Sequence, residues 1–321
     1  MNRKKWVALL IILVVFIAGL LVETVSDTNA RLADHPGISW EENIVSGSGT
    51  GKIVQLFVSG VISGEPSAAG APSMSEVLAE QLRRVEEDPS VKALVLRINS
   101  PGGEVVATDE LHTRLLRLKQ VRRIPIVVSM GSTAASGGYY LATAGDAIFA
   151  NPNTLTGSLG VIFNLLNYSE AANKLGVHQF AIKSGRFKDI GSPFRPLTTP
   201  ERQIFQSLVN ESYQKFVDVI VKGRNLSRQR VLEIADGRVY SGEQAKRLGL
   251  IDQFGDLEEA TRYALSLSGE REATVVRYTD QLSLSKLLFS LKQHLANPDP
   301  LGLSRSLERQ SSPQLLYQFM P

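Results

Sequence analysis

Apolar runs alternate with amphipathic segments through the middle of the chain. The apolar runs are short and nearly continuous, and they lie at Ile53–Val58, Ala93–Ile98, Ile126–Met130 and Ala147–Ala150. Runs of this kind are typical of strands that are buried on both faces of a sheet. Segments with helical spacing separate them, which predicts a β-α-β-α order with right-handed crossovers. The pattern therefore predicts an α/β fold around a parallel sheet.

Capping residues and apolar spacing mark the predicted helices. Ser73 followed by Glu76 forms a capping box that opens the first of them. The other helices are predicted over 104–120, from 136 onward, and over 201–221, 228–235 and 242–248. Residues 131–135 are small and are predicted to form a loop. The pattern weakens after Gly269, and we predict that residues 297–321, which hold several Pro, Ser and Gln residues, form a mobile tail.

The amino-terminal segment has the pattern of a membrane anchor. Residues 6–22 are apolar and uncharged, and they follow Arg3, Lys4 and Lys5. A helix needs about 17–25 such residues to cross a bilayer, and basic residues stay on the cytoplasmic side. We therefore expect a cytoplasmic segment at 1–5, a transmembrane anchor at 6–22 and an extracytoplasmic tether at 23–50. An uncleaved anchor is favoured over a removed signal peptide, whose apolar core usually has about 7–15 residues.

The amino-acid composition excludes several kinds of chemistry for this protein. The chain has 321 residues, of which 43% are hydrophobic, and a formal net charge of +3 with interspersed charges, so nothing indicates a nucleic-acid surface. It has no cysteine, which excludes disulfides and thiolate catalysis. Its four histidines are far apart and none has metal-ligand spacing. We predict no metal and no cofactor, and the usual general base of serine enzymes is missing.

Two glycine-containing motifs follow adjacent predicted strands, where sites form in open α/β sheets. Gly102 and Gly103 lead into a helix, so their backbone N–H groups could serve an oxyanion hole, or the pair could be an ordinary tight turn. Ser136 lies between small residues at a strand-to-helix turn. This is typical of a nucleophile elbow, but an N-cap serine has the same pattern.

A serine nucleophile needs a base, and lysine is the available candidate. The stretch 183–193 offers Lys183 and Lys188. A free lysine has a pKa of about 10.4, so service as a base near neutrality requires desolvation and a shift of about 3 units. Most lysines are solvated, and the residues alone do not decide between these two.

Five motifs in this order resemble the signal peptide peptidase A family in its short, single-domain form. They are SPGG (100–103), STAASGGYY (132–140), TGSLGV (156–161), KSGRFKDIGSPFRPLT (183–198) and DGRVYSGEQAKRLGLID (236–252). The resemblance runs from Ile53 to Leu257. It implies a crotonase-like fold, shared with Clp-type proteases, and a serine endopeptidase with its peptidase domain at 51–268 and a C-terminal extension and tail at 269–321.

The resemblance also implies a role for each site residue. Ser136 is the expected nucleophile, and Lys188 rather than Lys183 is the expected general base. Ser158 is expected to orient the Lys188 amine. The amides expected to form the oxyanion hole are those of Gly103 and Gly137.

Substrates and partners follow from the same resemblance. The expected substrates are cleaved signal peptides and other apolar peptides at the membrane. The family assembles into rings or domes, so we expect a homo-oligomer, in which a neighbouring subunit could complete each site. The chain would be a single-pass protein of the cell membrane, with its amino terminus in the cytoplasm and its catalytic domain outside.

Two other functions fit part of the pattern. A crotonase-type enzyme acting on coenzyme A thioesters would share the fold and the glycine oxyanion hole, but it does not account for an exported domain or for Ser136 and Lys188. An inactive membrane scaffold is the second alternative. A separate hypothesis concerns residues 313–321, whose Leu and Tyr content suggests that this end of the tail reaches into a binding groove and regulates access.

Overall fold

The computed structural model describes residues 40–66, 72–280 and 315–319. Two units divide the chain, one made of 1–41 with 279–283 and the other of 42–278 with 284–321. The second unit contains the whole site. The predicted anchor at 6–22 and most of the predicted tether lie outside the described residues. None of the helices in the described ranges combines the length and the apolar character that a bilayer crossing requires.

The structure is a mixed α/β fold, as the hydrophobic pattern predicts. Over the described residues its main sheet has nine strands, and the central path runs in the order β1-β11-β2-β3-β5-β6-β10. Neighbours from β11 to β10 along this path are parallel. The strands on the path are β1 (Trp40–Ser46), β2 (Gly51–Ser59), β3 (Val91–Ser100), β5 (Ile126–Ala135), β6 (Ala147–Ala150), β10 (Gln253–Phe254) and β11 (Ala273–Asp280). The strand β7 (Leu155–Gly157) joins β5 in parallel and β9 (Val239–Ser241) in antiparallel pairing.

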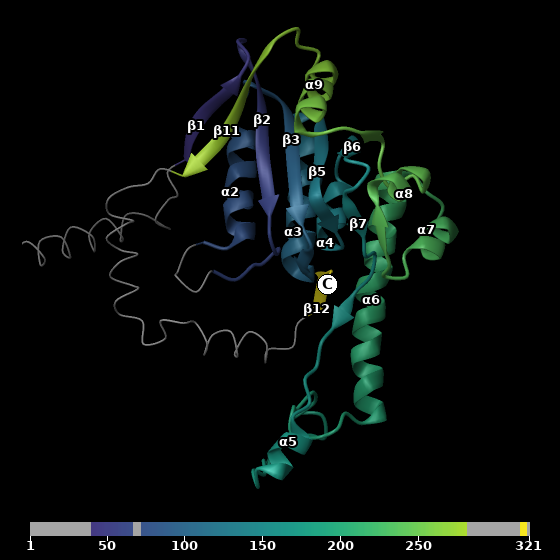
Figure 1. The fold of residues 1–321 in the computed structure, drawn as a ribbon. Helices are drawn as coiled ribbons and strands as arrows, with labels where there is room; N and C mark the ends of the chain where they lie inside the picture. The colour runs from purple at the N-terminus through teal and green to yellow at the C-terminus, as the bar shows by residue number, and fades with distance from the viewer. Residues whose placement is uncertain (1–39, 67–71, 281–314, 320–321) are drawn as a thin grey trace, which may run out of the picture. The chain divides into compact units, whose positions relative to one another are not determined.

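Helices cover both faces of this sheet (Figure 1). On one face Ala260 and Ala264 of α9 (Leu257–Ser268) pack with Ile53, Val95 and Val127. On the other face lie α2 (Met74–Glu87) and α3 (Val105–Arg122), which are followed by α4 (Gly137–Ala142). The two-sided burial explains why the central strands contain nearly continuous apolar runs.

Capping boxes are found where the sequence predicts that helices begin. Ser73 and Glu76 form the predicted capping box at the start of α2. A second capping box, formed by Thr198 and Glu201, opens α6. The helices beyond α4 are α5 (Ser169–Lys174), α6 (Thr199–Arg224), α7 (Arg228–Ile234) and α8 (Gly242–Arg247).

Three segments differ from the prediction. The predicted loop at 131–135 is wrong, because these residues continue β5, where Ala134 pairs with both Ser100 and Thr156. Residues 40–46, predicted as tether, form β1. Residues 273–280, where the pattern weakens, form β11 beside β2. In each case pairing with another strand of the sheet holds the segment in an extended conformation.

A second, three-stranded sheet lies beside the ends of β3 and β5. It has the order β4-β12-β8, made of β4 (Gly102–Glu104), β12 (Leu315–Gln318) and β8 (Ile162–Phe163), and both pairings are antiparallel. The prediction of a mobile tail is therefore wrong for residues 315–318, which are held as the central strand. Neither partner of β12 is near it in sequence.

The chain from β8 to the start of α6, which we call the arm (residues 164–198), extends away from the main sheet (Figure 1). It contains α5 and the predicted base. Residues 173–188 are all exposed. Large apolar side chains are among them, and Phe180 and Ile182 are almost fully exposed.

Candidate active site

Paired strands bring the two serines of the predicted site together. Ser136 follows β5 and Ser158 follows β7, and the register places Ala135 opposite Gly157. The Ser136 amide donates to the Gly157 carbonyl oxygen at 2.8 Å, and the Ser158 amide donates to the Arg238 carbonyl oxygen at 2.7 Å. Adjacent strands therefore fix both serines by backbone hydrogen bonds at one edge of the sheet.

Ser136 has the backbone of a sharp, strained turn. Its φ is 52° and its ψ is −115°, a combination that costs a non-glycine residue about 1–3 kcal/mol. Its side chain makes no capping hydrogen bond to α4, so Ser136 does not act as a side-chain N-cap. Its Oγ is buried and has no hydrogen-bond partner among the described residues. A strained serine with an unused hydroxyl is typical of a nucleophile elbow.

Two glycine loops meet in backbone contact beside this serine. Gly102 has a φ of +99°, and a Cβ there would lie 2.6 Å from the Gly137 nitrogen. A Cβ at Gly103 would lie 2.0 Å from the Ile62 carbonyl oxygen. Only glycine lets the backbones approach this closely. The predicted oxyanion-hole residues Gly103 and Gly137 thus lie beside Ser136.

The chain's own tail occupies this place. In β12, Tyr317 is paired with Gly103 and Gln318 with Gly102. The Phe319 amide continues the pairing and donates to the Pro101 carbonyl oxygen at 2.7 Å. The Tyr317 carbonyl oxygen lies 3.0 Å from the position of a Cβ on Gly137. An extended peptide is thus bound with one carbonyl beside the predicted oxyanion hole.

The Tyr317 side chain fills an aromatic slot. Its ring is fully buried, stacks on Tyr140 at a centroid distance of 5.1 Å, and lies tilted against Phe216 at 4.8 Å. Its hydroxyl donates to the Ser212 carbonyl oxygen at 2.9 Å. Burial, together with the charge of Asp109, raises the pKa of Tyr317, so this phenol stays neutral.

Polar contacts hold the slot from behind. The Tyr140 hydroxyl donates to Asp109 at 2.7 Å, and Lys215 of α6 forms an ion pair with the same carboxylate at 2.6 Å. His112 lies edge-on to Tyr140, and its Nε2 is 3.0 Å from the Thr143 hydroxyl. Burial lowers the pKa of His112 to about 4. The imidazole is therefore neutral at ordinary pH and serves the packing of this slot.

The structure separates the two candidate lysines. Lys183 forms an ion pair with Asp189 at 2.6 Å. Asp189 also binds Arg195, whose guanidinium reaches Glu201 as well. The hydrogen bond from Arg195, followed by that from Lys183, holds the pKa of Asp189 well below its usual range. The Lys183 amine is thus held in an ion pair with Asp189.

Lys188 does not meet Ser136 within the chain. It is exposed on the arm, in the segment between α5 and α6, which extends away from the sheet (Figure 1). The buried Ser136 hydroxyl has no partner among the described residues. The structure therefore gathers Ser136, Ser158, Gly103 and Gly137 but leaves the predicted base apart from them.

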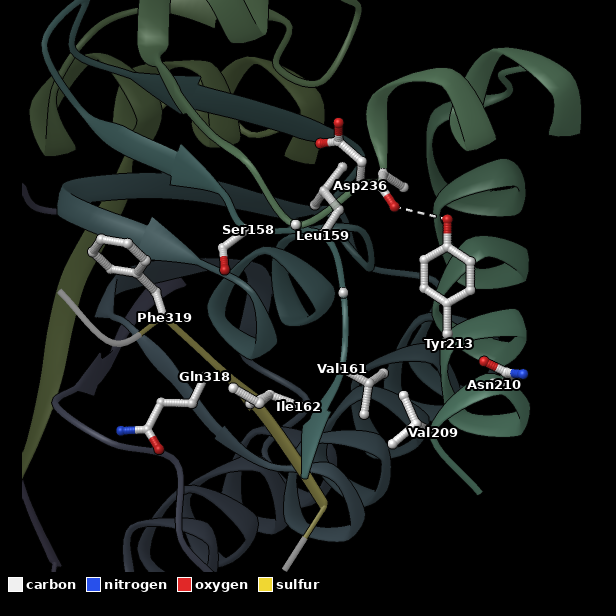
Figure 2. Close-up of a pocket in the computed structure, with 13 residues that line it drawn as sticks. Ser158, Leu159, Val161, Ile162, Val209, Asn210, Tyr213, Asp236, Gln318 and Phe319 are labelled. Atoms are coloured by element: carbon white, nitrogen blue, oxygen red, sulfur yellow. Dashed lines mark hydrogen bonds between the residues drawn. The ribbon is translucent and has the colours of Figure 1, made fainter. Parts of the chain in front are cut away.

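A cavity of about 560 Å³ adjoins Ser158. The segment 158–162 forms one wall and α6 forms another, with Val209, Asn210 and Tyr213 facing the cavity (Figure 2). Gln318 and Phe319 of the tail lie at a further side (Figure 2). Within residues 40–66, 72–280 and 315–319, no group of three acidic or histidine side chains is arranged to hold a metal ion.

Sequence reasoning missed the slot residues. Phe216 is a core position of a long helix in sequence, and Tyr140 lies inside a motif that draws attention to its serine. Tyr317 has the only available signal, an aromatic residue among apolar neighbours in a polar tail, and that signal motivated the hypothesis that the tail reaches a groove. The structure bears out this placement for residues 315–319.

The sequence is similar to several known proteins. The model of peptidase family S49 matches residues 119–269, and the model of Clp protease matches residues 67–156. An inferred signal peptide peptidase SppA of Enterococcus faecium is 37% identical over 87% of this chain and 85% of its own. Protease 4 of Haemophilus influenzae is 35% identical over 70% of this chain and 36% of its own. The chloroplastic serine protease SPPA of Arabidopsis thaliana is 35% identical over 63% of this chain and 30% of its own.

Proposed function

From the premise that the chain belongs to the SppA-type serine peptidases of family S49, we propose that it hydrolyses peptides through a Ser136–Lys188 dyad. The main observation that supports this proposal is the buried Ser136 hydroxyl, which lies beside a glycine-lined groove that already holds an extended peptide. Family membership also speaks against the two alternatives, a coenzyme A thioester enzyme and an inactive scaffold.

In the proposed reaction a neutral Lys188 removes the proton from Ser136. The serine oxygen then attacks a peptide carbonyl, and the Gly103 and Gly137 amides stabilise the oxyanion. Loss of one such donor typically costs about 100- to 1000-fold in rate. The amine returns its proton to the leaving nitrogen and then activates the water that hydrolyses the acyl-enzyme. Ser158 orients the amine throughout.

We propose that Lys188 reaches Ser136 from a second copy of the chain. Within one chain the arm carries Lys188 away from the sheet, while the cavity beside Ser158 leaves room for an incoming side chain. The arm also exposes the large apolar side chains of Phe180, Ile182 and Leu175, which burial against another chain would cover. A closed homo-oligomer, a ring or a dome, gives every arm a neighbouring site.

The finer assignments of fold, place and substrate belong to the same proposal. The sheet with its β4 edge supports a crotonase-like fold. The apolar run at 6–22 behind basic residues supports a membrane anchor with the catalytic unit outside the cytoplasm. Cleaved signal peptides, which are extended and apolar, suit a groove that binds a strand and buries an aromatic side chain. Recovery of the full chain in alkali-washed membranes would test the anchor, and release into the soluble fraction would contradict it.

Complementation tests the dyad and its arrangement in one experiment. Ser136→Ala and Lys188→Ala are each expected to abolish hydrolysis of a quenched fluorescent peptide. If the dyad forms between chains, co-expression of the two inactive variants restores about a quarter of the sites, since each site draws its two residues from different, randomly mixed chains. Full activity of either variant alone would refute the dyad. Two inactive variants that never complement would place both residues in one chain.

A further inference from the structure

We propose that Glu104 is a positioning residue for the oxyanion hole. Its carboxylate holds residues 62–64 along the edge of β4 that faces away from β12, and so fixes the direction of the Gly103 amide. This inference rests on the proposed peptidase function and adds a residue that acts through Gly103 without touching the substrate. Its basis is the set of hydrogen bonds that joins residues 62–64 to β4 and to the start of α3.

The strand β4 is short and is held by a neighbour on each side. It has three residues, and β12 pairs with one of its edges. On the other edge, Ile62 forms a parallel bridge with Gly103. The Ile62 amide donates to the Gly102 carbonyl oxygen at 2.8 Å, and the Glu104 amide donates to the Ile62 carbonyl oxygen at 2.8 Å. The direction of the Gly103 amide therefore depends on the position of Ile62.

Gly103 and Ile62 are in such close contact that neither can move alone. A Cβ on Gly103 would lie 2.0 Å from the Ile62 carbonyl oxygen and 2.6 Å from the Ile62 nitrogen. The Ile62 side chain is fully buried, so the core holds this residue as well. Because close-packed groups transmit displacements to their neighbours, a shift of Ile62 would also shift the oxyanion donor.

The Glu104 carboxylate holds the two residues that follow Ile62. The Ser63 hydroxyl donates to Glu104 Oε1 at 2.8 Å, and the Gly64 amide donates to Glu104 Oε2 at 2.9 Å. Both carboxylate oxygens are thus bound to consecutive residues of one segment. Hydrogen bonds to an ionised carboxylate are about twice as strong as those between neutral groups. Loss of the carboxylate should therefore release Ser63 and Gly64, and loosen Ile62 beside them.

Glu104 occupies the N-cap position of α3 but does not cap the helix. Its side chain makes no hydrogen bond to the first amides of α3 among the described residues. Serine, threonine, aspartate and asparagine are the residues preferred at this position, because their short side chains reach those amides. A glutamate here, with both oxygens directed to Ser63 and Gly64, indicates that the carboxylate serves the segment beside β4 and not the helix.

Glu104→Gln in the full-length chain tests this role, because it keeps the size of the side chain but replaces one accepting oxygen by an amide nitrogen. We expect kcat for a quenched fluorescent peptide to fall about 10-fold, less than the 100-fold or more that follows the complete loss of an oxyanion donor. A peptide aldehyde adds the Ser136 hydroxyl to form a hemiacetal whose oxygen occupies the same hole, so its inhibition constant should rise by a similar factor. The affinity of the matching unreactive peptide amide, measured in the Ser136→Ala background, should change no more than about 2-fold.

Three further variants control this experiment. Glu110→Gln is the matched control, because Glu110 is an exposed glutamate of the same helix, and it should leave kcat unchanged. Ser63→Ala removes one of the two hydrogen bonds and should lower kcat about 3-fold, whereas Ser63→Thr keeps the hydroxyl and should retain the activity. Ser63→Ala and Glu104→Gln together should cost less than the product of their separate effects, since both act through one contact. A loss in Glu104→Gln no larger than in Glu110→Gln, or a rise in KM with kcat intact, would overturn the positioning role.

Amide hydrogen exchange separates this inference from the proposed function. If the unmodified chain cleaves no peptide, the peptidase is refuted, and exchange in residues 60–65, measured by mass spectrometry, still decides the role of Glu104. Glu104→Gln should speed exchange of the Ile62 and Gly64 amides about 10-fold, as the loss of a hydrogen bond to a charged group predicts. Unchanged exchange in these residues would overturn the inference and leave an active peptidase intact.

Discussion

The edge of the sheet around Ser136 and the arm around Lys188 are built in opposite ways. At the edge, backbone hydrogen bonds, glycine contacts and a buried aromatic slot fix every group. On the arm, residues 173–188 are all exposed, and the ordered contacts are mainly ion pairs around Asp189. Among the described residues, the sheet edge is packed on all sides, whereas the arm leaves large apolar side chains exposed.

This difference indicates how the proposed enzyme would be controlled. In the proposal, the nucleophile, the oxyanion hole and the groove would form as soon as one chain folds. The proposed base would arrive only with assembly, so an unassembled chain would carry no active dyad. Proteolysis would then be confined to the oligomer.

The largest expected effect distinguishes the two arm lysines. Lys188→Met should lower kcat by about 10⁴-fold or more, the scale seen when a nucleophile loses its base. Lys183→Met should cost no more than about 10-fold, because the Lys183 amine already holds Asp189 and contributes only to the shape of the arm. Burst kinetics with an activated ester would measure both. Equal and complete loss in the two variants would show that Asp189 and its partners, rather than Lys188, carry the function of the arm.

The next effect tests the glycine contact at the sheet edge. Gly102→Ala places a methyl group 2.6 Å from the Gly137 nitrogen and 1.9 Å from the Tyr317 carbonyl oxygen, so turnover should fall more than about 100-fold. Gly269→Ala is the matched control, since it has a similar positive φ of 77° and nothing within 4 Å of the new methyl. The control should lose about 1 kcal/mol of stability and keep its activity. Comparable activities of the two folded variants would contradict the crowded groove.

Some parts of the candidate site can be predicted from the sequence and others cannot. Strand ends in a parallel sheet meet at one edge, so SPGG, ASGGYY and TGS could be brought together by pattern alone. The strand β12 could not, because its partners at Gly103 and Ile162 are over 150 residues away, so its apolar and aromatic residues suggest a buried segment without showing which strands it joins. The base could be named only through the family resemblance, since the Lys188 side chain has no hydrogen-bond or ion-pair partner among the described residues that would reveal its role.

A smaller effect is expected where the arm shapes the surroundings of the base. Arg195 covers Asp189, the neighbour of Lys188, with hydrogen bonds to both carboxylate oxygens. Arg195→Gln removes the fork of donors that holds Asp189 and Glu201 together, so the segment that carries Lys188 should be less well positioned and kcat should fall about 10-fold. Arg195→Lys, which keeps the charge but not the fork of donors, should fall between Arg195→Gln and the unmodified chain. Hydrolysis of a quenched fluorescent peptide measures both variants, and an unchanged kcat in Arg195→Gln would show that this network does not position Lys188.

The smallest effect at neutral pH concerns the sheet edge and its buried imidazole. Thr143 donates its hydroxyl hydrogen to the Tyr140 carbonyl oxygen, so His112 Nε2 must be the donor to Thr143. Burial lowers the pKa of His112 from 6.5 to about 4 in the folded chain. Between these pH values the unfolded chain binds a proton that the folded chain does not, so stability falls as pH falls from about 6.5 to 4 and is unaffected above. The loss should amount to roughly 3 kcal/mol.

His112→Gln keeps a side-chain donor for Thr143 but cannot titrate. Thermal unfolding of the variant should therefore show a weaker decline from pH 6.5 to 4 than that of the unmodified chain, with nearly equal peptidase activity at pH 7.5. The ion pairs of the arm behave differently, because the pKa of Asp189 lies well below this window and its contacts persist through it. Acid would then loosen the edge that holds the nucleophile before it disturbs the arm. An unchanged decline in His112→Gln would assign the acid sensitivity to another group and remove this distinction between the two regions.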